Sequence, residues 1–186
     1  KTFKEKITFI TYAPLEAQIS AISDDIAYNN HDIQDGIKAN LFKLEELVEI
    51  DFFKSIYFKY KNKINKKNYK IATYQIIRDS IDLMIRDLLV NTQKNLKVFK
   101  IKSVKDVAKV DQLVVSFSDK LQNSEKEIRF FLRTKMYNNK SVLRKNQRGK
   151  VIVKKLFNII KSNPRKFLSK DQLTKDKFRA ISDFIS

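Results

Sequence analysis

The first long pattern of apolar positions starts near residue 15. After Leu15, apolar side chains recur at spacings of three, four or seven residues, at Ile19, Ile22, Ile26 and Ile33. This period matches one face of an α-helix. Pro14 is favourable at the first helical position, and Glu16 suits the positive end of the helix dipole. We therefore expect a helix from about residue 15, with a break or kink at Gly36.

Two more patterns of helical period follow. Residues 44–61 place one set of apolar side chains on an inner face: Leu47, Ile50, Phe53, Ile56 or Tyr57, and Tyr60. Residues 69–96 give the clearest pattern of the chain, with a sustained period of about 3.6 residues through Tyr74, Ile77, Ile81, Ile85 with Met84, and Leu88. The polar, basic stretch at residues 61–68 is expected to connect these two helices.

Most of the remaining chain also has helical character. Residues 118–137 and 140–162 are each expected to form a helix. Asn163 and Pro164 interrupt the pattern, and a last helix is expected over residues 174–186. Residues 104–115 form a short apolar run, which does not distinguish a helix from a strand. The β-branched residues 7–11 are compatible with an extended segment.

The composition favours an all-α fold. Only two glycines and two prolines occur in 186 residues, too few for the tight turns of a β-sandwich. Hydrophobic residues make up 42% of the chain, which supports a packed core rather than disorder. The chain has no cysteine and no apolar run of the roughly 20 residues that span a bilayer. We therefore expect a cytoplasmic protein without disulfides and without membrane association.

The net charge of +18 is unevenly distributed along the chain. Residues 15–51 carry nine acidic and two basic side chains, whereas residues 52–186 carry 34 basic and 11 acidic ones. A basic surface can attract nucleic acid, phosphorylated small molecules or anionic lipids. The alternative explanation is an AT-rich genome, whose codons favour lysine and asparagine and produce a solvated lysine coat.

The first helix carries a polar stripe of possible chemical importance. Asp24, Tyr28 and Asp32 are spaced four residues apart, so they line nearly one helix face, with Ile22 and Ile26 on the opposite side. A carboxylate can ligate a divalent cation, a phenol ring can stack on a sugar, and a second carboxylate can accept a hydroxyl proton. The spacing alone favours a solvated polar helix face and does not establish a site.

The residue strings around this stripe resemble a known family. The strings LEAQI at residues 15–19 and SDDIAYNNHDIQDGI at residues 23–37 resemble the LEAQI…(A/S)DDIAYxxHDLxDG(L/I) segment of bacterial dGTPase-like proteins. These proteins are metal-dependent phosphohydrolases of the HD-domain superfamily. Residues 136–164 and 179–186 resemble later segments of the same family, so the match extends with gaps over nearly the whole chain. The resemblance implies a multi-helix bundle of the HD-domain type.

The resemblance also implies a domain organisation. Residues 1–60 would form the C-terminal part of the catalytic domain, and residues 61–186 would form a helical C-terminal region packed on it. The chain begins at Lys1 without a methionine and ends at Ser186 within a helical pattern. We therefore expect a fragment that lacks the N-terminal helices of the bundle.

Individual roles follow from the matched motif. Asp24 matches the last ligand of the family's His…His-Asp…Asp metal site. Tyr28 matches a sugar-contacting tyrosine, and Asp32 an aspartate that binds the 3′-hydroxyl group. Asp25 belongs to the same substrate-binding motif and would support the site without ligating the metal. The implied reaction is hydrolysis of a dNTP to the deoxynucleoside and inorganic triphosphate, with Mn²⁺ or Mg²⁺ as the expected metal and Fe²⁺ or Zn²⁺ as alternatives.

The chain departs from the family pattern in its histidines. His31 is the only histidine, and it lies inside the Asp24 motif rather than in the family's metal-binding His-Asp pair. We expect it on the helix surface. The other metal ligands and the catalytic histidine would then lie upstream, so no catalytic residue is assigned in this chain and we expect it to be inactive alone. The family also implies a homo-oligomer and possible binding of single-stranded nucleic acid.

Binding of the triphosphate group should use basic and phenolic side chains, because phosphate oxygens accept charge-assisted hydrogen bonds. Lys70, Tyr74 and Arg78 recur every four residues and are candidates. A second candidate cluster contains the basic and phenolic residues Arg133, Lys135 and Tyr137. Both sets are equally compatible with an exposed basic edge. Two alternative functions remain open, a basic helical nucleic-acid-binding module and an all-α scaffold.

Overall fold

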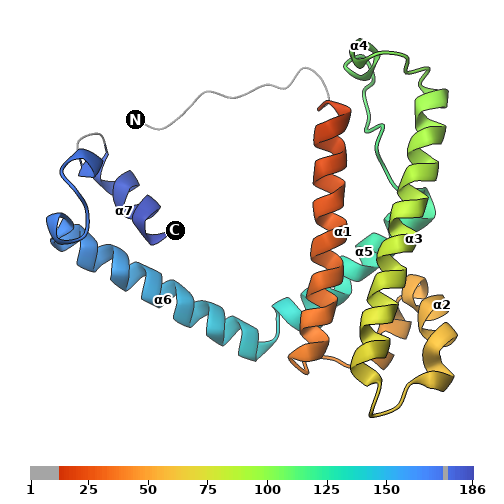
Figure 1. The fold of residues 1–186 in the computed structure, drawn as a ribbon, viewed down its shortest axis with the longest axis horizontal. Coiled ribbons are helices and arrows are strands. Elements are labelled where there is room, and N and C mark those ends of the chain that lie inside the picture. The colour runs from red at the N-terminus through yellow and green to blue at the C-terminus, as the bar shows by residue number, and fades with distance from the viewer. Residues whose placement is uncertain (1–12, 174–175) are drawn as a thin grey trace. The chain divides into compact units, whose positions relative to one another are not determined.

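The computed structural model describes residues 13–173 and 176–186, and every regular element in these two ranges is helical (Figure 1). This confirms the predicted all-α class for the described residues. The extended segment predicted at residues 7–11 lies outside them. Within these ranges, no helix combines the length and the apolar character that a membrane crossing requires.

The contacts divide the chain into two compact units, Lys1–Met136 and Tyr137–Ser186. Residues on both sides of position 60 belong to the first unit, where the helix that ends at Tyr60 packs on the helix that begins at Tyr69. The predicted boundary at residue 60 concerns the extent of a catalytic domain and stays a prediction.

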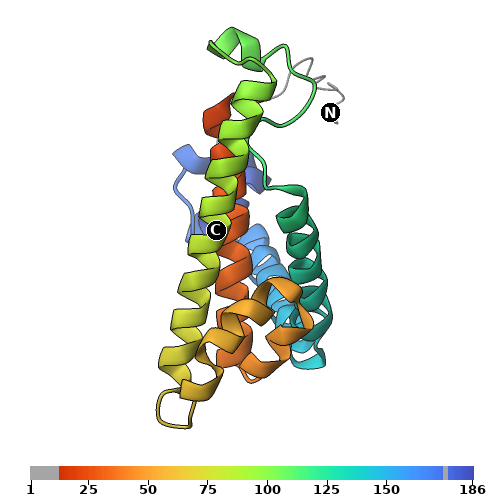
Figure 2. The ribbon, with the colours of Figure 1, turned by 90° about the vertical axis from the view of Figure 1, so that its right-hand side faces the viewer.

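The first unit is built on three long helices and a shorter one. Its elements in chain order are α1 (Leu15–Lys38), η1 (Leu44–Glu49), α2 (Asp51–Tyr60), η2 (Lys61–Lys63), α3 (Tyr69–Val98), α4 (Val104–Val107), α5 (Asp119–Leu132) and the π-helical turn η3 (Arg133–Tyr137). α1 packs against α3 and α5, and α2 packs against the same two helices (Figures 1 and 2). Apolar side chains from α1, α2, α3 and α5 form one core.

α1 continues past Gly36, so the break predicted there is wrong. Gly36 lies inside the helix. A glycine is needed there because the ring of Phe42 packs directly against its backbone and leaves no space for a Cβ atom. The helix ends instead near Asn40, which adopts a positive φ of 53°. The N–H group of Leu41 then donates to the carbonyl of Gly36 at 2.9 Å, which closes the helix end.

Two other sequence expectations are corrected by the packing. Residues 44–61 do not form one helix, because Ile50 adopts extended backbone angles between η1 and α2. Three side chains that the apolar patterns placed inward are substantially exposed instead: Ile19, Tyr74 and Ile85. On α3 the polar Ser80 is buried together with Met84, because the core contacts that face of the helix.

The apolar run at residues 104–115 forms no strand. It contains the short helix α4, after which residues 108–118 lead without regular helix into α5. The side chain of Asn95 on α3 donates to the carbonyl of Val114 at 2.9 Å and so holds this connection in place. A local sequence pattern does not predict hydrogen bonds of this kind, because the two partners are far apart in the sequence.

The second unit contains α6 (Lys140–Ser162), η4 (Pro164–Lys166), η5 (Asp171–Leu173) and α7 (Lys177–Ile185). α7 packs on α6 around the buried side chains of Ile160, Leu168 and Ile181. The carboxylate of Asp176 accepts hydrogen bonds from the first N–H groups of α7, which caps the start of that helix. The predicted helix over residues 140–162 is therefore confirmed, as is a terminal helix.

Candidate functional site

The polar stripe lies on the solvent-facing side of α1. The side chain of Tyr28 is 63% exposed, and Asp24 is also exposed. On the opposite side of the helix, Ile26 and Ile33 are 5% and 0% exposed. The spacing argument therefore placed the two faces of α1 correctly. Asp32 is half-buried, so the stripe passes from open surface toward the packed side.

The two neighbouring aspartates of α1 differ in their surroundings. Asp24 forms no hydrogen bond or ion pair within the part of the chain that the structure describes, so its carboxylate is available to a ligand. Asp25 instead pairs with Arg129 of α5, whose terminal nitrogen lies 3.0 Å from Asp25 Oδ2. Among the described residues, one of the two carboxylates is therefore open and the other is paired.

Asp24 can supply one oxygen ligand to a hard divalent cation. Among residues 13–173 and 176–186, no group of three or more histidine, cysteine, aspartate or glutamate side chains is placed to hold a metal ion. A single open carboxylate therefore fits as one member of a ligand set and does not form a complete site. His31, the one histidine of the sequence, is exposed on the surface of α1.

The phosphate-binding candidates on α3 share an exposed face. Lys70 Nζ lies 5.8 Å from the centre of the Tyr74 ring. Both residues line a cavity of about 370 Å³ between the end of α1 and the start of α3, and Lys38 of α1 contributes a second ammonium group. Arg78 is exposed but does not line this cavity. The structure thus brings two of the three candidates together.

Tyr69 forms part of the wall of the same cavity. Its hydroxyl oxygen accepts a hydrogen bond of 2.8 Å from the N–H group of Leu44 and lies 3.4 Å from Glu45 Oε2. Burial raises the pKa of the Tyr69 phenol above its ordinary value of 10.0. The phenol therefore keeps its proton, which it donates to Glu45 Oε2.

The second candidate cluster is not organised as a phosphate site. Lys135 is half-buried, and its ammonium group lies 2.8 Å from Glu46 Oε2 and 3.4 Å from Glu49 Oε1. These carboxylates already neutralise it. Arg133 is exposed on the π-helical turn, and Tyr137 belongs to the second unit.

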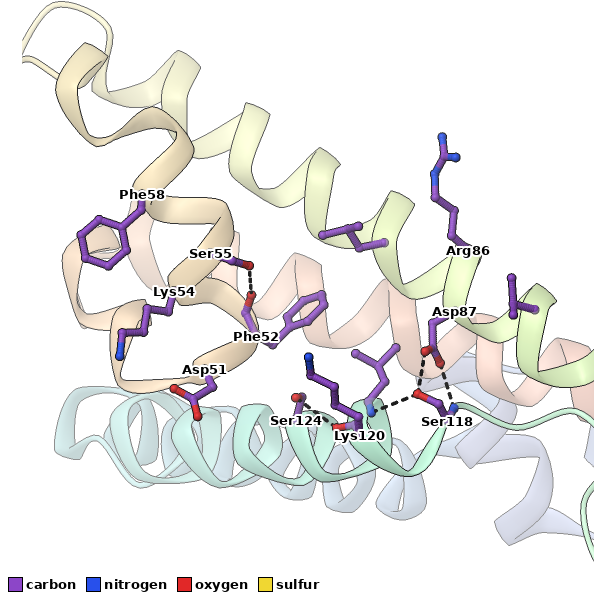
Figure 3. A pocket seen from close by; sticks show the side chains of 13 residues that line it. Asp51, Phe52, Lys54, Ser55, Phe58, Arg86, Asp87, Ser118, Lys120 and Ser124 are labelled. Atoms are coloured by element: carbon purple, nitrogen blue, oxygen red, sulfur yellow. Dashed lines mark hydrogen bonds between the residues drawn. The ribbon is translucent and has the colours of Figure 1, made fainter.

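A cavity of about 800 Å³ lies between α2, α3 and α5 (Figure 3). None of its lining residues comes from α1, so it is separate from the polar stripe. Ser118 closes one end by donating from its N–H and hydroxyl groups to Asp87, at 2.8 and 2.6 Å. The cavity is also lined by three basic side chains, Lys54, Arg86 and Lys120.

Three polar residues near the stripe were not identified from the sequence. Gln18 and Asn30 of α1 are 5% and 1% exposed, and both form hydrogen bonds inside the unit. Arg129 of α5 reaches Asp25 across the helix packing. A polar residue on the apolar side of a helical pattern was the available signal for Gln18 and Asn30. No local signal identifies the partner of Arg129.

α6 in the second unit concentrates basic charge. Its 23 residues include eight lysines and arginines and no acidic residue, and most of its length is exposed. The basic residues are Lys140, Arg144, Lys145, Arg148, Lys150, Lys154, Lys155 and Lys161. The basic surplus of the later chain is therefore partly gathered on one helix.

Comparison with known proteins gives consistent matches. Residues 115–186 match the family model described as the phosphohydrolase-associated domain. The whole chain is 62% identical, over 186 residues, to a deoxyguanosinetriphosphate triphosphohydrolase-like protein of Pelagibacter ubique (strain HTCC1062), of which it covers 50%.

More distant relatives carry the same name. The chain is 33% identical over 161 residues, 87% of its length, to a relative from Bartonella tribocorum, of which it covers 40%. It is 32% identical over 178 residues, 92% of its length, to a relative from Leptospira interrogans, of which it covers 47%. The chain thus spans about half or less of the length of the curated relatives it matches.

Proposed function

Because this chain belongs to the deoxyguanosinetriphosphate triphosphohydrolase-like proteins of the HD superfamily, we propose that it forms part of a dNTP-hydrolysing site. The products would be the deoxynucleoside and inorganic triphosphate. The observation that carries this proposal is the exposed carboxylate of Asp24, which has no partner among the described residues, one helical turn from the exposed ring of Tyr28. Both lie within the residues that resemble the family motif.

Each residue of the stripe has a specific proposed task. Asp24 would be one oxygen ligand of a divalent metal ion. The ring of Tyr28 would stack against the deoxyribose, and Asp32 would accept the proton of its 3′-hydroxyl group. A bound divalent ion would polarise the α-phosphate and lower the pKa of a coordinated water. The sequence contains a single histidine, so a two-histidine ligand set needs residues from outside it.

The cavity between α1 and α3 supports a place for a phosphate group other than the α-phosphate at the metal, because Lys38 lies about 21 Å along α1 from Asp24. Lys70 provides a positive charge and Tyr74 a phenolic donor, whereas Lys38 pairs with Asp35 at 3.2 Å. Charge-assisted hydrogen bonds from such groups suit phosphate oxygens. This cavity lies next to the last turns of the helix that carries the stripe, since Gln34 and Lys38 both line it.

Hydrolysis assays on the complete gene product test the proposal. Triphosphate release from each of the four dNTPs is measured with Mn²⁺ or Mg²⁺. We expect activity on at least one dNTP and its loss in Asp24→Asn. The matched control is Asp82→Asn, which removes an exposed carboxylate from α3 and should retain activity. An inactive wild type, or an unchanged Asp24→Asn variant, would refute the proposed reaction.

The basic helix α6 favours a second candidate function, binding of single-stranded nucleic acid. A run of eight bases without an acid gives a positive field along the helix, and phosphate contacts of this kind weaken steeply with salt. Binding of a labelled oligonucleotide is measured at increasing salt for the wild type and for Lys154→Gln/Lys155→Gln. Equal affinities, or no salt dependence, would exclude this role for α6.

A further inference from the structure

Two residues of α5 hold the turn of α1 that carries Asp24. Arg129 contacts Asp25 Oδ2 at 3.0 Å through its terminal nitrogen, and its Nε donates to the carboxylate of Glu125. Glu125 in turn accepts a hydrogen bond of 3.3 Å from the side-chain amide of Asn29. The pair Arg129–Glu125 therefore contacts two positions that lie one helical turn apart on α1.

A second attachment lies on the other side of Asp24. The side-chain oxygen of Gln18 accepts hydrogen bonds from the N–H groups of Val114 and Val115, each at 3.0 Å. Its amide nitrogen donates to the carbonyl of Ala13 at 2.6 Å. Gln18 is buried, so these bonds are shielded from water. The match to the phosphohydrolase-associated domain begins at residue 115. Residues of this matched segment therefore contact α1 on both sides of Asp24, through Val115 on one side and through Glu125 and Arg129 on the other.

Arg129 also places a positive charge beside the adjacent carboxylates of α1. Asp24 and Asp25 are adjacent carboxylates, and an uncompensated Asp25 would repel a polyphosphate ligand. The guanidinium is ionised at any ordinary pH, and its positive charge is shared between Glu125 and Asp25. Its planar fork reaches two carboxylates through different nitrogens, which a lysine ammonium reproduces poorly.

We propose that Arg129 is a positioning residue of the site on α1, which fixes the Asp24–Asp25 turn against α5 through its ion pair with Asp25. This inference rests on the proposed dNTP hydrolysis. Arg129 acts through Asp25 and makes no contact with the substrate. The segment that matches the phosphohydrolase-associated domain would thereby hold a helix of the catalytic site in place.

Kinetics of Arg129→Gln in the complete gene product test the inference. The matched control is Arg86→Gln, because Arg86 pairs with Asp82 within α3 at 2.7 Å and both side chains are exposed. Misplacing a reacting geometry can cost about 100-fold in rate. We expect kcat of Arg129→Gln to fall by about 10-fold to 100-fold, with a smaller change in KM, and Arg86→Gln to retain kcat.

Two further variants separate positioning from a general loss of stability. Arg129→Lys keeps the positive charge but not both contacts, so its kcat should lie between those of the wild type and Arg129→Gln. Adding Asp25→Asn to Arg129→Gln should not lower kcat further, because residues that act through one contact are not additive. Hydrogen exchange along α1 should be faster in Arg129→Gln than in Arg86→Gln.

The outcomes distinguish this inference from the function on which it rests. If the wild type hydrolyses dNTPs and Arg129→Gln matches Arg86→Gln in kcat, the positioning role is wrong and the proposed function stands. If the wild type hydrolyses no dNTP, the proposed function fails and the inference falls with it. If Arg129→Gln does not fold, Arg129→Lys decides: a kcat equal to that of the wild type refutes the role, and a reduced kcat supports it.

Discussion

Ser80 on α3 forms a hydrogen bond with Asn30 on α1 in the interior of the first unit. The two side chains are 0% and 1% exposed. The amide nitrogen of Asn30 also donates to the carbonyl of Ile26 at 2.8 Å. The bond between Ser80 and Asn30 helps to fix the rotation of α1 on α3, and so which face of α1 meets solvent.

Ser80→Ala should destabilise the protein by about 1–3 kcal/mol, because the side-chain oxygen of Asn30 loses its buried donor. Equilibrium unfolding in urea measures the change. Replacing both partners, as in Asn30→Leu/Ser80→Ala, should cost less than Ser80→Ala alone if the new side chains pack well. An unchanged urea midpoint for Ser80→Ala would mean that the bond contributes nothing to stability.

Gly36→Ala should destabilise the protein, although alanine favours helix. A Cβ atom at this position would overlap the buried ring of Phe42, which packs edge-on against Phe131 with ring centres 4.9 Å apart. Overpacking of this kind costs about 1–3 kcal/mol. Gly149→Ala in α6 is the control, because nothing lies within 4 Å of its added Cβ.

The control should stabilise α6 by up to about 1 kcal/mol, the propensity difference between glycine and alanine. Thermal unfolding of both variants therefore gives shifts of opposite sign. The same sign for both would show that the ring of Phe42 moves aside at little cost.

Lys70→Gln should weaken dNTP binding without changing the fold. If Lys70 binds a phosphate oxygen in the cavity between α1 and α3, its removal costs about 1.5–3 kcal/mol of binding. This corresponds to a rise of KM by roughly tenfold or more. Lys94→Gln removes an exposed lysine farther along α3 and should leave KM unchanged. Equal KM values for the two variants would exclude a phosphate-binding role for Lys70.

The ion pair between Glu46 and Lys135 should make stability depend on pH at both extremes. The hydrogen bond from Lys135 lowers the pKa of Glu46 from its ordinary value of 4.5, and the backbone N–H of Lys43 adds to the effect. The ionised carboxylate therefore stabilises the folded state above pH 4.5, and this contribution disappears as the pH falls through the lowered pKa. The hydrogen bond to Glu46 raises the pKa of Lys135 above 10.5, so its contribution disappears as the pH rises through that raised value.

Glu46→Gln should therefore cost about 0.5–1 kcal/mol at neutral pH, as expected for a partly exposed pair, and less at an acidic pH below the lowered pKa. Chemical unfolding at both pH values measures this difference. Glu127→Gln, which removes an exposed carboxylate of α5, serves as the control and should show no such dependence. An equal cost of Glu46→Gln at both pH values would contradict the assignment.

Local periodicity was sufficient to predict much of this protein. The all-α class, the helix from residue 15, the long helix from residue 69 and the helix over residues 140–162 all follow from the spacing of apolar side chains, because that spacing is a property of one segment. The same spacing placed Asp24 and Tyr28 opposite Ile26. The family motif then assigned roles to these residues, which stay predictions.

Only the tertiary structure decided how the helices are attached to one another. The burial of Gln18 and Asn30, the pairing of Arg129 with Asp25 and the close approach of Phe42 to Gly36 all join residues that no local pattern relates. The exposure of Ile19 and Tyr74 has the same origin, because an amphipathic pattern identifies a face and not the neighbour that covers it. Sequence periodicity fixes the faces of each helix, whereas long-range packing and hydrogen bonding select which faces meet.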